Sequence, residues 1–390
     1  NDTNDETSEK WIFYLRENEE LEEVNDNHIL FFVVILCCHK SLNKIGGTSI
    51  MRDLHTLKGK TIGVVYSYEG EDAPGFSHYH YWKSDIISKW ITAIQQIKCI
   101  PYILDVRTFV EKSIAGTLPT LDFVLNLNCG GCELSTMSLI PSICCFFHIP
   151  CIPCDAVAIL AGENKRISNL AAIATGLQVP KSLLPNQTNG IFRPLNLGSS
   201  IGIKKGPLVG NEPDGLYQEF IQGYDITTPI VYNPYIDEMD FMPTVIYIPA
   251  EADSNWFLGE KFKETRSGFK REAIFSLSDK LKNTYLALTK NLSINTFCRI
   301  DARIKCESEQ HLMEILKHPL ELEDIYFIEL NPMPTVWINN AFSYSFSMIK
   351  KNHTLYPYID QLTNIIDEEC NVHQFLLSLS MLSFYNHVQK

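Results

Sequence analysis

In the first half of the chain, from residue 61 onward, short apolar runs alternate with longer amphipathic stretches. The apolar runs at residues 61–66, 102–104 and 122–127 predict buried strands. The stretches 83–97 and 106–115 repeat apolar residues with the helical period and predict helices. Strands that alternate with helices predict a parallel sheet, whose ligands gather at the carboxyl ends of the strands.

Later segments are of two kinds. Residues 155–176 predict one long helix that contains Lys165, and residues 279–290 predict another. Other segments alternate apolar and polar residues with the strand period of two, and the first of them turns at Gly223. These segments are residues 216–231, 243–248 and 298–304.

Two further helical regions are predicted near the carboxyl end. Residues 307–324 read as an acidic helical insertion between two strands. The apolar segment FLLSLSMLSFY, residues 375–385, predicts a helix that packs on the body of the protein.

The stretch YFIELNPMPT, residues 326–335, changes from apolar to polar within three residues. Glu329 and Asn331 occupy alternate positions of the predicted strand, so they project from one face. Pro332 ends the strand because it has no N–H to donate. A carboxylate and an amide in this setting suit Mg²⁺. Taken alone, the stretch is better explained as a strand whose end happens to be polar.

A second carboxylate comes from the strand CRIDARI, residues 298–304, where Arg299 and Asp301 share a face. The segment richest in glycine, residues 191–206, adds Ser199 and Ser200 with backbone amides that can close over a phosphate. Arg193 supplies a permanent cation there. A plain hairpin loop would explain the glycines, but it accounts less well for the cation and the paired serines.

Composition narrows the class of protein. The 390 residues are 45% hydrophobic and 20% charged, which allows a large core, and the net charge of -13 argues against nonspecific nucleic-acid binding. The longest strongly apolar run, residues 29–38, has about half the length of a membrane-spanning helix. We therefore expect neither nucleic acid nor a membrane as a partner. Twelve cysteines without a recognisable signal peptide favour the reducing cytoplasm.

Two features keep alternatives open. The first 56 residues predict an appendage, whose apolar run could pair with residues 11–16, cover a sheet edge or form a homodimer contact. Cys129, Cys132, Cys151 and Cys154 form two C-x2-C pairs with a spacing found in zinc sites. The apolar helical pattern between these pairs favours core cysteines over bound zinc.

In chain order, these motifs resemble the ATP-grasp superfamily, and most closely its D-alanine:D-alanine ligase branch. The resemblance covers about residues 61–349 and rests on RPLNLGSSIGI, QEFIQGYDIT, RID and ELNPMP. It implies an α/β fold with an amino-terminal parallel α/β domain and two lobes that clamp ATP. It also implies an enzyme that joins a carboxylate to an amine.

The resemblance and the patterns together predict five parts. They are an appendage at 1–56, an α/β substrate domain at 57–155, a central ATP-grasp lobe at 156–230, a carboxyl-terminal ATP-grasp lobe with the metal site at 231–350, and a helical segment at 351–390.

The resemblance implies six nucleotide-binding residues, one of which is Lys261. Lys165 and Arg193 would contact the ATP phosphates, Glu219 and Ile221 would face adenine, and Asp225 would bind the ribose.

Catalytic roles are implied in the same way. Ser199 and Ser200 would cover the phosphates, and Lys261 would reach the terminal phosphate. Arg299 would stabilise the acyl phosphate and the tetrahedral oxyanion. The ligands implied for two Mg²⁺ ions are Asp301, Glu329 and Asn331.

The sequence departs from the family pattern at one phosphate-binding position and where substrates would bind. Arg193 replaces a lysine, and Asn128 with Cys129 replaces a His-Gly pair. Thr335 follows ELNPMP where the family has glycine, and Asn340 stands near the position of an acceptor-binding serine. The candidate substrate residues are Glu69, Glu71, Glu133, Thr335 and Asn340.

Three functions compete. The leading hypothesis is an ATP-dependent carboxylate–amine ligase that acts on amino acids or related carboxylates. The second is D-alanine:D-alanine ligase activity, which the changed acceptor positions disfavour. The third is a nucleotide-binding module without catalysis, which the retained Asp301, Glu329 and Asn331 argue against.

Overall fold

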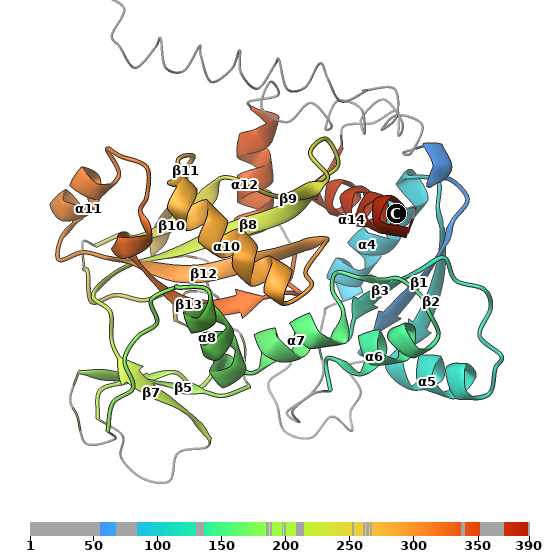
Figure 1. Cartoon of the computed structure of the whole chain (residues 1–390), viewed down its shortest axis with the longest axis horizontal. Helices are drawn as coiled ribbons and strands as arrows, with labels where there is room; N and C mark the ends of the chain where they lie inside the picture. Colours follow the sequence, from blue (N-terminus) through green and yellow to red (C-terminus); the bar gives the residue numbers. More distant parts are fainter. Residues whose placement is uncertain are drawn as a thin grey trace, which may run out of the picture. The chain divides into compact units, whose positions relative to one another are not determined.

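The computed structural model describes most of the chain beyond residue 54. The described residues are 55–67, 84–129, 136–184, 187, 189–196, 198, 200–207, 214–251, 253–259, 262, 265, 267–336, 340–351 and 370–388. All of them belong to one compact unit, Met51–Lys390, which contains three sheets and their helices (Figure 1).

The first sheet is parallel, with the order β2-β1-β3-β4. Its strands are β1 (Thr61–Tyr66), β2 (Ile100–Asp105), β3 (Phe123–Leu127) and β4 (Cys151–Ile152), and its helices are α4 (Ser84–Gln96), α5 (Val106–Ile114) and α6 (Leu139–Phe146). Strands β1, β3 and β4 are largely buried, as expected when helices cover both faces of a sheet, whereas the edge strand β2 is mostly half-buried or exposed. The predicted parallel sheet is therefore confirmed.

The single helix predicted for residues 155–176 is wrong. The structure has two helices, α7 (Ala156–Glu163) and α8 (Lys165–Ala174), separated at Asn164. The Asn164 backbone is extended, with φ -101° and ψ 107°, and its side chain accepts hydrogen bonds from the N–H groups of Arg166 and Ile167. An asparagine that caps the next helix cannot also continue the previous one.

The second sheet is antiparallel, with the order β6-β5-β7. Its strands are β5 (Gly190–Pro194), β6 (Lys204–Lys205) and β7 (Gly215–Glu219). The glycine-rich segment connects β5 to β6, so it forms the turn of a hairpin.

The third sheet is also antiparallel, with the order β11-β10-β8-β12-β13, and β9 pairs with β8. Its strands are β8 (Gly223–Asn233), β9 (Glu238–Phe241), β10 (Thr244–Pro249), β11 (Phe269–Ile274), β12 (Phe297–Lys305) and β13 (Ile325–Asn331). The alternating segments predicted as strands lie in β7, β8, β10 and β12, whereas β9 and β11 were not predicted.

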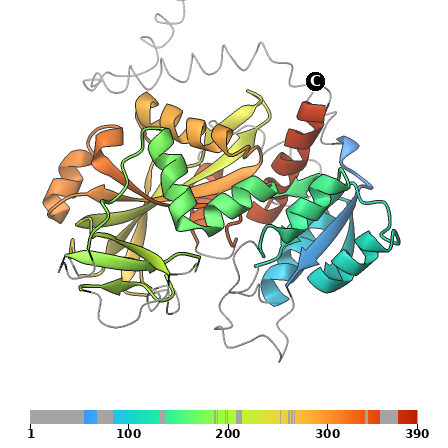
Figure 2. The ribbon, with the colours of Figure 1, turned by 60° about the horizontal axis from the view of Figure 1, so that its bottom comes forward.

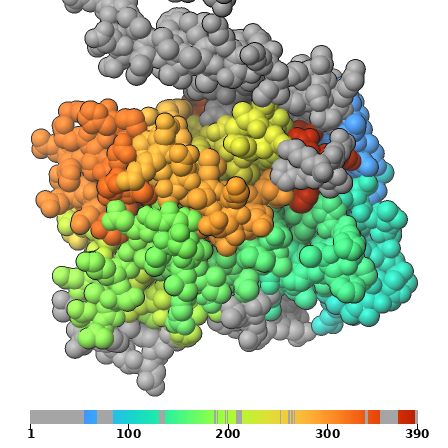
Figure 3. Space-filling view, in the orientation of Figure 1, coloured from blue at the N-terminus to red at the C-terminus, as the bar shows by residue number. Residues whose placement is uncertain are grey.

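The remaining helices lie between or after the last strands of the third sheet in the chain. They are α10 (Asp279–Asn291), α11 (Glu309–Ile315), the short 3-10 helix η2 (Leu322–Asp324), α12 (Ala341–Lys350) and α14 (Val372–Val388). The predicted acidic insertion is helical only in α11 and η2. Helices α8 and α10 contact each other on the face shown in Figure 3.

Helix α14 packs on the body of the unit, as predicted. It contacts α4, β4, β8 and α12, and Figure 2 shows it beside the parallel sheet. Phe375, Leu376 and Leu377 are buried at consecutive positions, so α14 is buried on several sides. None of the helices in the described part of the chain has the length and apolar composition needed to cross a membrane.

Candidate active site

The candidate site lies where β12 and β13 pair. Asp301 lies opposite Glu329, and Arg299 lies opposite Asn331. The register then shifts, because Ala302 lies opposite Phe327 and leaves Ile328 as an extra residue on β13. Residues that lie opposite one another share a face, so this β-bulge puts Glu329 and Asn331 on the face of Asp301.

The bulge resolves a conflict within the sequence of β13. Ile325, Phe327, Glu329 and Asn331 are separated by two residues each, so a regular strand would put all four on one face. In the structure Ile325 and Phe327 are buried, while the Glu329 side chain is 24% exposed. The extra residue lets one strand send apolar side chains to the core and polar side chains to the site.

Asp301 is held by two donors. Thr227 Oγ1 donates to Asp301 Oδ1 at 2.7 Å, and Arg299 Nε donates to Oδ2 at 3.3 Å. Burial acts to lower the pKa of Arg299, but the charges of Asp301, Tyr247 and Glu329 outweigh it and raise that pKa above its usual value. The guanidinium is therefore a permanent cation beside two carboxylates.

Lys165 comes to the same place from a different element. It is the first residue of α8, and its Nζ lies 3.9 Å from Glu329 Oε2. Its backbone N–H donates to the carbonyl of Leu195 at 3.0 Å, which ties the start of α8 to the chain just beyond β5. Since the side chain is only 4% exposed, its position depends on where α8 begins.

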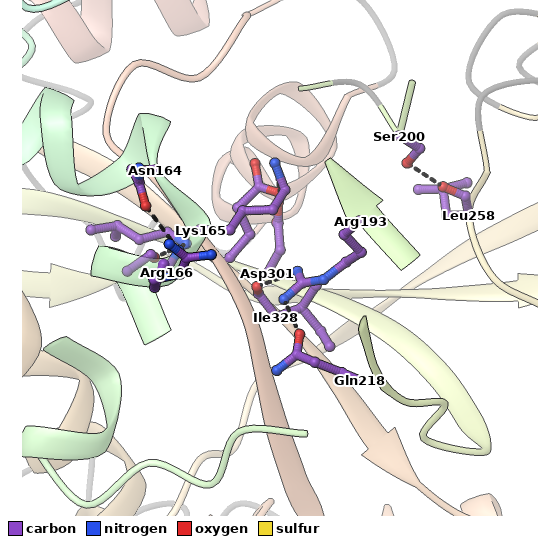
Figure 4. A network of polar contacts seen from close by, with 12 residues as sticks. Asn164, Lys165, Arg166, Arg193, Ser200, Gln218, Leu258, Asp301 and Ile328 are labelled. Atoms are coloured by element: carbon purple, nitrogen blue, oxygen red, sulfur yellow. Dashed lines mark hydrogen bonds and ion pairs between the residues drawn. The ribbon is translucent and has the colours of Figure 1, made fainter. Parts of the chain in front are cut away.

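Arg193 joins the second and third sheets. Its Nη1 donates to the Ile328 carbonyl at 2.6 Å, and its Nη2 donates to Gln218 Oε1 at 2.8 Å (Figure 4). Burial lowers the pKa of Arg193, and the charge of Glu329 opposes that shift. Ile328 is the extra residue of the bulge, so Arg193 binds the carbonyl that the irregular ladder offers.

The glycine-rich turn is attached to the segment 253–259. Ser200 has a φ of 66°, and its Oγ donates to the Leu258 carbonyl at 3.0 Å (Figure 4). Lys205 Nζ donates to the Asn255 carbonyl at 3.0 Å. The Leu258 N–H donates to Asp225 Oδ2 at 2.7 Å, so the backbone of this one residue links the turn to β8.

The residues predicted to bind adenine and ribose lie near the β7–β8 connection. Glu219 exchanges two hydrogen bonds with Lys181, one through its backbone N–H and one through Oε1. Ile221 is buried, and its carbonyl accepts from Arg303 Nε at 2.8 Å. Asp225 Oδ1 accepts from Arg303 Nη1 at 2.7 Å.

Thr335 and Asn340 are brought together. Asn340 Nδ2 donates to the Thr335 carbonyl, and Asn340 Oδ1 accepts from the Ser343 N–H at 3.0 Å. Asn340 is the N-cap of α12, so in this structure its amide serves the helix and the turn before it.

Five predicted site residues lie outside the described ranges. They are Glu69, Glu71, Glu133, Ser199 and Lys261.

The donor set fits Mg²⁺ better than zinc. Asp301, Glu329 and Asn331 offer hard oxygens on one face, and Mg²⁺ completes its shell with water and phosphate oxygens. No group of three or more His, Cys, Asp or Glu side chains suited to a metal occurs among the residues that the structure describes.

Two of the four cysteines considered for zinc, Cys151 and Cys154, have the environment of core residues, whereas Cys129 is half-buried. Cys132 lies outside the described ranges, and Cys151 is buried in an apolar cluster with Cys144. Cys154 Sγ donates to the Pro332 carbonyl at 3.3 Å, and burial raises the pKa of that thiol well above its usual value. Zinc requires a thiolate, which this burial disfavours.

Three site residues were missed from the sequence. Thr227 is two positions after Asp225 and Arg303 is two positions after Asp301, so the strand period could have placed both on the site face. Gln218 is buried between Arg193 and the Pro180 carbonyl, and only its position beside Glu219 pointed to it.

No protein-family model matches the chain, and no curated protein matches it. Solved structures do resemble it. The D-alanine–D-alanine ligase from Bacillus anthracis complexed with ATP is 15% identical, covers 85% of this chain and 99% of its own, and has a TM-score of 0.54.

Two further structures agree. The VanG D-Ala:D-Ser ligase from Enterococcus faecalis is 14% identical over 84% of this chain and 100% of its own, with a TM-score of 0.52. The D-alanyl-alanine synthetase A from Vibrio cholerae is 14% identical over 80% of this chain and 99% of its own, with a TM-score of 0.53. The chain therefore has the ATP-grasp fold of the D-alanine–D-alanine ligase structures.

Proposed function

We propose that this protein is an ATP-dependent ligase that joins a carboxylate to an amine and releases ADP and phosphate. The observation that carries the proposal is the convergence of Lys165, Arg299, Asp301, Glu329 and Asn331 at the bulged β12–β13 pair. Two cations and three oxygen ligands at one place suit a reaction in which negative charge moves between phosphate and carboxylate.

The reaction would have two steps. A carboxylate oxygen of the first substrate attacks the terminal phosphorus of ATP, so that an acyl phosphate forms and ADP leaves. The amine of the second substrate then attacks the acyl carbon, an amide bond forms, and phosphate leaves. Arg299 would stabilise the negative oxygen that develops on the acyl carbon.

The other residues would bind and orient ATP. Lys165 and Arg193 would contact phosphates, with Arg193 also keeping its contacts to Gln218 and Ile328. Mg²⁺ bound by Asp301, Glu329 and Asn331 would offset phosphate charge during transfer.

Further roles would complete the site. Glu219 and Ile221 would face adenine, and Asp225 would bind ribose. Ser199, Ser200 and Lys261 would close over the phosphates. The candidate substrate residues remain Glu69, Glu71, Glu133, Thr335 and Asn340.

Domain limits and compartment belong to the proposal too. The limit at residue 155 is supported by the gap between β4, which ends at Ile152, and α7, which begins at Ala156. A reducing cytoplasm is supported by the free thiols of all nine cysteines in the described ranges.

The test is an assay of ADP release with amino acids and related carboxylates, offered singly and in pairs, with mass detection of the product. We expect release that requires ATP, Mg²⁺ and one carboxylate–amine pair. If no pair stimulates release while ATP still binds, the protein is a nucleotide-binding module. If D-alanine alone supports rapid release, the argument from the changed acceptor positions is wrong.

A further inference from the structure

Arg303 is buried on β12 and is not part of the reaction described above. The residue is 4% exposed, and it lies opposite Asp225 in the pairing of β12 with β8. A buried guanidinium carries a large desolvation cost unless its N–H groups find acceptors, so the set of acceptors shows what the residue holds in place.

Four hydrogen bonds surround the guanidinium. Nε donates to the Ile221 carbonyl at 2.8 Å, and Nη1 donates to Asp225 Oδ1 at 2.7 Å. Nη2 donates to the carbonyls of Gly223 at 2.5 Å and Trp256 at 2.9 Å. Three of the four acceptors therefore belong to residues 221–225, the connection into β8.

The aromatic ring of Phe220 extends this contact. The Arg303 guanidinium carbon lies 4.9 Å from the centroid of the Phe220 ring, and Lys205 Nζ lies 3.7 Å from the same centroid. Cations over an aromatic ring are attracted by its quadrupole. Arg303 thus contacts the chain on both sides of Ile221.

Asp225 is the one charged acceptor in the set. Arg303 fixes its Oδ1, and the Leu258 N–H fixes its Oδ2 at 2.7 Å. Arg303 also binds the Trp256 carbonyl, so it supports the segment that presents the Leu258 N–H. A carboxylate oxygen accepts about two hydrogen bonds, so one protein donor on each oxygen still allows Asp225 to accept a ligand hydroxyl.

We propose that Arg303 is a positioning residue for ribose recognition, which aims the Asp225 carboxylate at the hydroxyl groups of a bound ribonucleotide. The proposal rests on the nucleotide site proposed above. The planar fork of arginine suits this task, because it binds the carboxylate and the flanking carbonyls at fixed angles, which a lysine ammonium cannot reproduce.

The test compares two nucleotides by titration calorimetry. ATP carries both ribose hydroxyls, and dideoxy-ATP lacks both. We expect the wild-type protein to bind ATP about tenfold more tightly than dideoxy-ATP, the effect of one or two hydrogen bonds to a charged acceptor. In Arg303→Met this ratio falls close to one, and in Arg303→Lys it is intermediate.

Lys305→Met is the matched control, because it removes a cation from the same strand two residues away. Lys305 is exposed and its Nζ lies 5.8 Å from the Tyr326 ring centroid, with no hydrogen bond to Asp225 among the described contacts. We expect it to keep the wild-type ratio. Asp225→Asn should lower the ratio, and Asp225→Asn combined with Arg303→Met should lower it no further.

The outcomes separate the two proposals. If the wild-type protein binds ATP and Arg303→Met keeps the wild-type ratio, the role of Arg303 is wrong and the ligase proposal stands. If the wild-type protein does not bind ATP, both are overturned. Should Arg303→Met fail to fold, Arg303→Lys decides, because loss of stability alone would weaken binding of both nucleotides equally and leave their ratio unchanged.

Discussion

At the scale of a single residue, the position and exposure of Glu329 indicate its role. Its carboxylate lies opposite Asp301 across the β12–β13 ladder, and it lies 3.9 Å from the buried Lys165 Nζ. Its side chain is 24% exposed, so it borders solvent and does not fill the core. A change of its charge should therefore affect chemistry far more than packing.

We expect Glu329→Gln to lower ADP release by at least about a hundredfold, because it removes a negative metal ligand while keeping the side-chain volume. Stability should change little, by about 1 kcal/mol, since the partner Lys165 loses one ion pair. Steady-state rates and thermal melts measure the two effects.

Glu314→Gln is the control for this variant. Glu314 lies on the surface helix α11, and its side chain is 60% exposed. Among the contacts described, its one ion pair is with Lys317. Glu314→Gln should keep both rate and stability. A Glu329→Gln protein with a normal rate would remove Glu329 from the site.

The sequence predicted which residues form the site better than it predicted which groups those residues contact. Glu329 and Asn331 were predicted at the end of one strand and Asp301 within another, and the structure brings them to one face. The contact of Arg193 with Ile328 could not be predicted, because it joins two sheets and depends on a carbonyl that only the bulge exposes.

At the scale of elements, the break at Asn164 determines where Lys165 lies. The Asn164 side chain accepts from two backbone N–H groups at the start of α8, and Nδ2 also donates to Asn196 Oδ1 at 3.4 Å. We expect Asn164→Ala to cost about 1 kcal/mol of stability and to weaken ATP binding. Chemical unfolding and calorimetry measure these changes.

Asn164→Asp keeps the capping oxygen and should retain stability. If Asn164→Ala bound ATP as tightly as the wild-type protein, the Asn164 cap would not determine the position of Lys165.

Helix α7 packs against the end of β13 through Gly162. A Cβ added there would lie 2.2 Å from Pro332 Cδ and 3.1 Å from the Leu330 carbonyl oxygen. We expect Gly162→Ala to destabilise the fold by about 2 kcal/mol, because backbone and proline atoms must move. Urea unfolding measures the loss.

Ala158→Gly is the control on the same helix. It should lower the free energy of unfolding by about 1 kcal/mol through its lower helix propensity, without adding an atom. A Gly162→Ala protein as stable as the wild type would show that α7 moves away from Pro332 at no cost.

Element predictions succeeded where a local pattern was sufficient. The parallel sheet and strands β8, β10 and β12 followed from period and length. The predicted helix at 155–176 failed because helical periodicity continues across Asn164, and only the capping geometry shows the break. Strands β9 and β11 are short and mostly polar or half-buried, so they lack an apolar run.

At the scale of the whole molecule, α14 returns the end of the chain to the parts that carry the site. His373 on α14 is buried, and its Nε2 lies 3.1 Å from the Val336 carbonyl. Its ring packs against Trp90 in a T-shaped arrangement, with the ring centroids 4.8 Å apart. Val336 follows the polar end of β13, so this one contact joins the last helix to the site strand.

The burial of His373 predicts a pH dependence of stability. Burial lowers its pKa from 6.5 to about 4, and the hydrogen bond to Val336 opposes that shift. The unfolded state therefore binds more protons than the folded state between these values. The contribution of neutral His373 to the free energy of unfolding should be fully present above about pH 6.5. It should fall as the pH drops toward about 4, by up to about 3 kcal/mol.

The effect of His373 can be separated from that of the carboxylates by comparing the wild-type protein with His373→Gln in urea at both ends of this pH range. The variant should lose less stability on acidification. An equal loss in both proteins would show that His373 does not determine the acid sensitivity.

The bulge at Ile328 also separates the acidic face of the site from the contact that joins two sheets. An in-frame deletion of Ile328 would place Glu329 directly after Phe327, so a regular ladder would still put Glu329 opposite Asp301 and Asn331 opposite Arg299. The deletion would instead remove the Ile328 carbonyl, which accepts from Arg193 Nη1. For this protein, therefore, a gap of one position between Tyr326 and Glu329 in a future alignment would predict loss of the Arg193 contact and not loss of the acidic face.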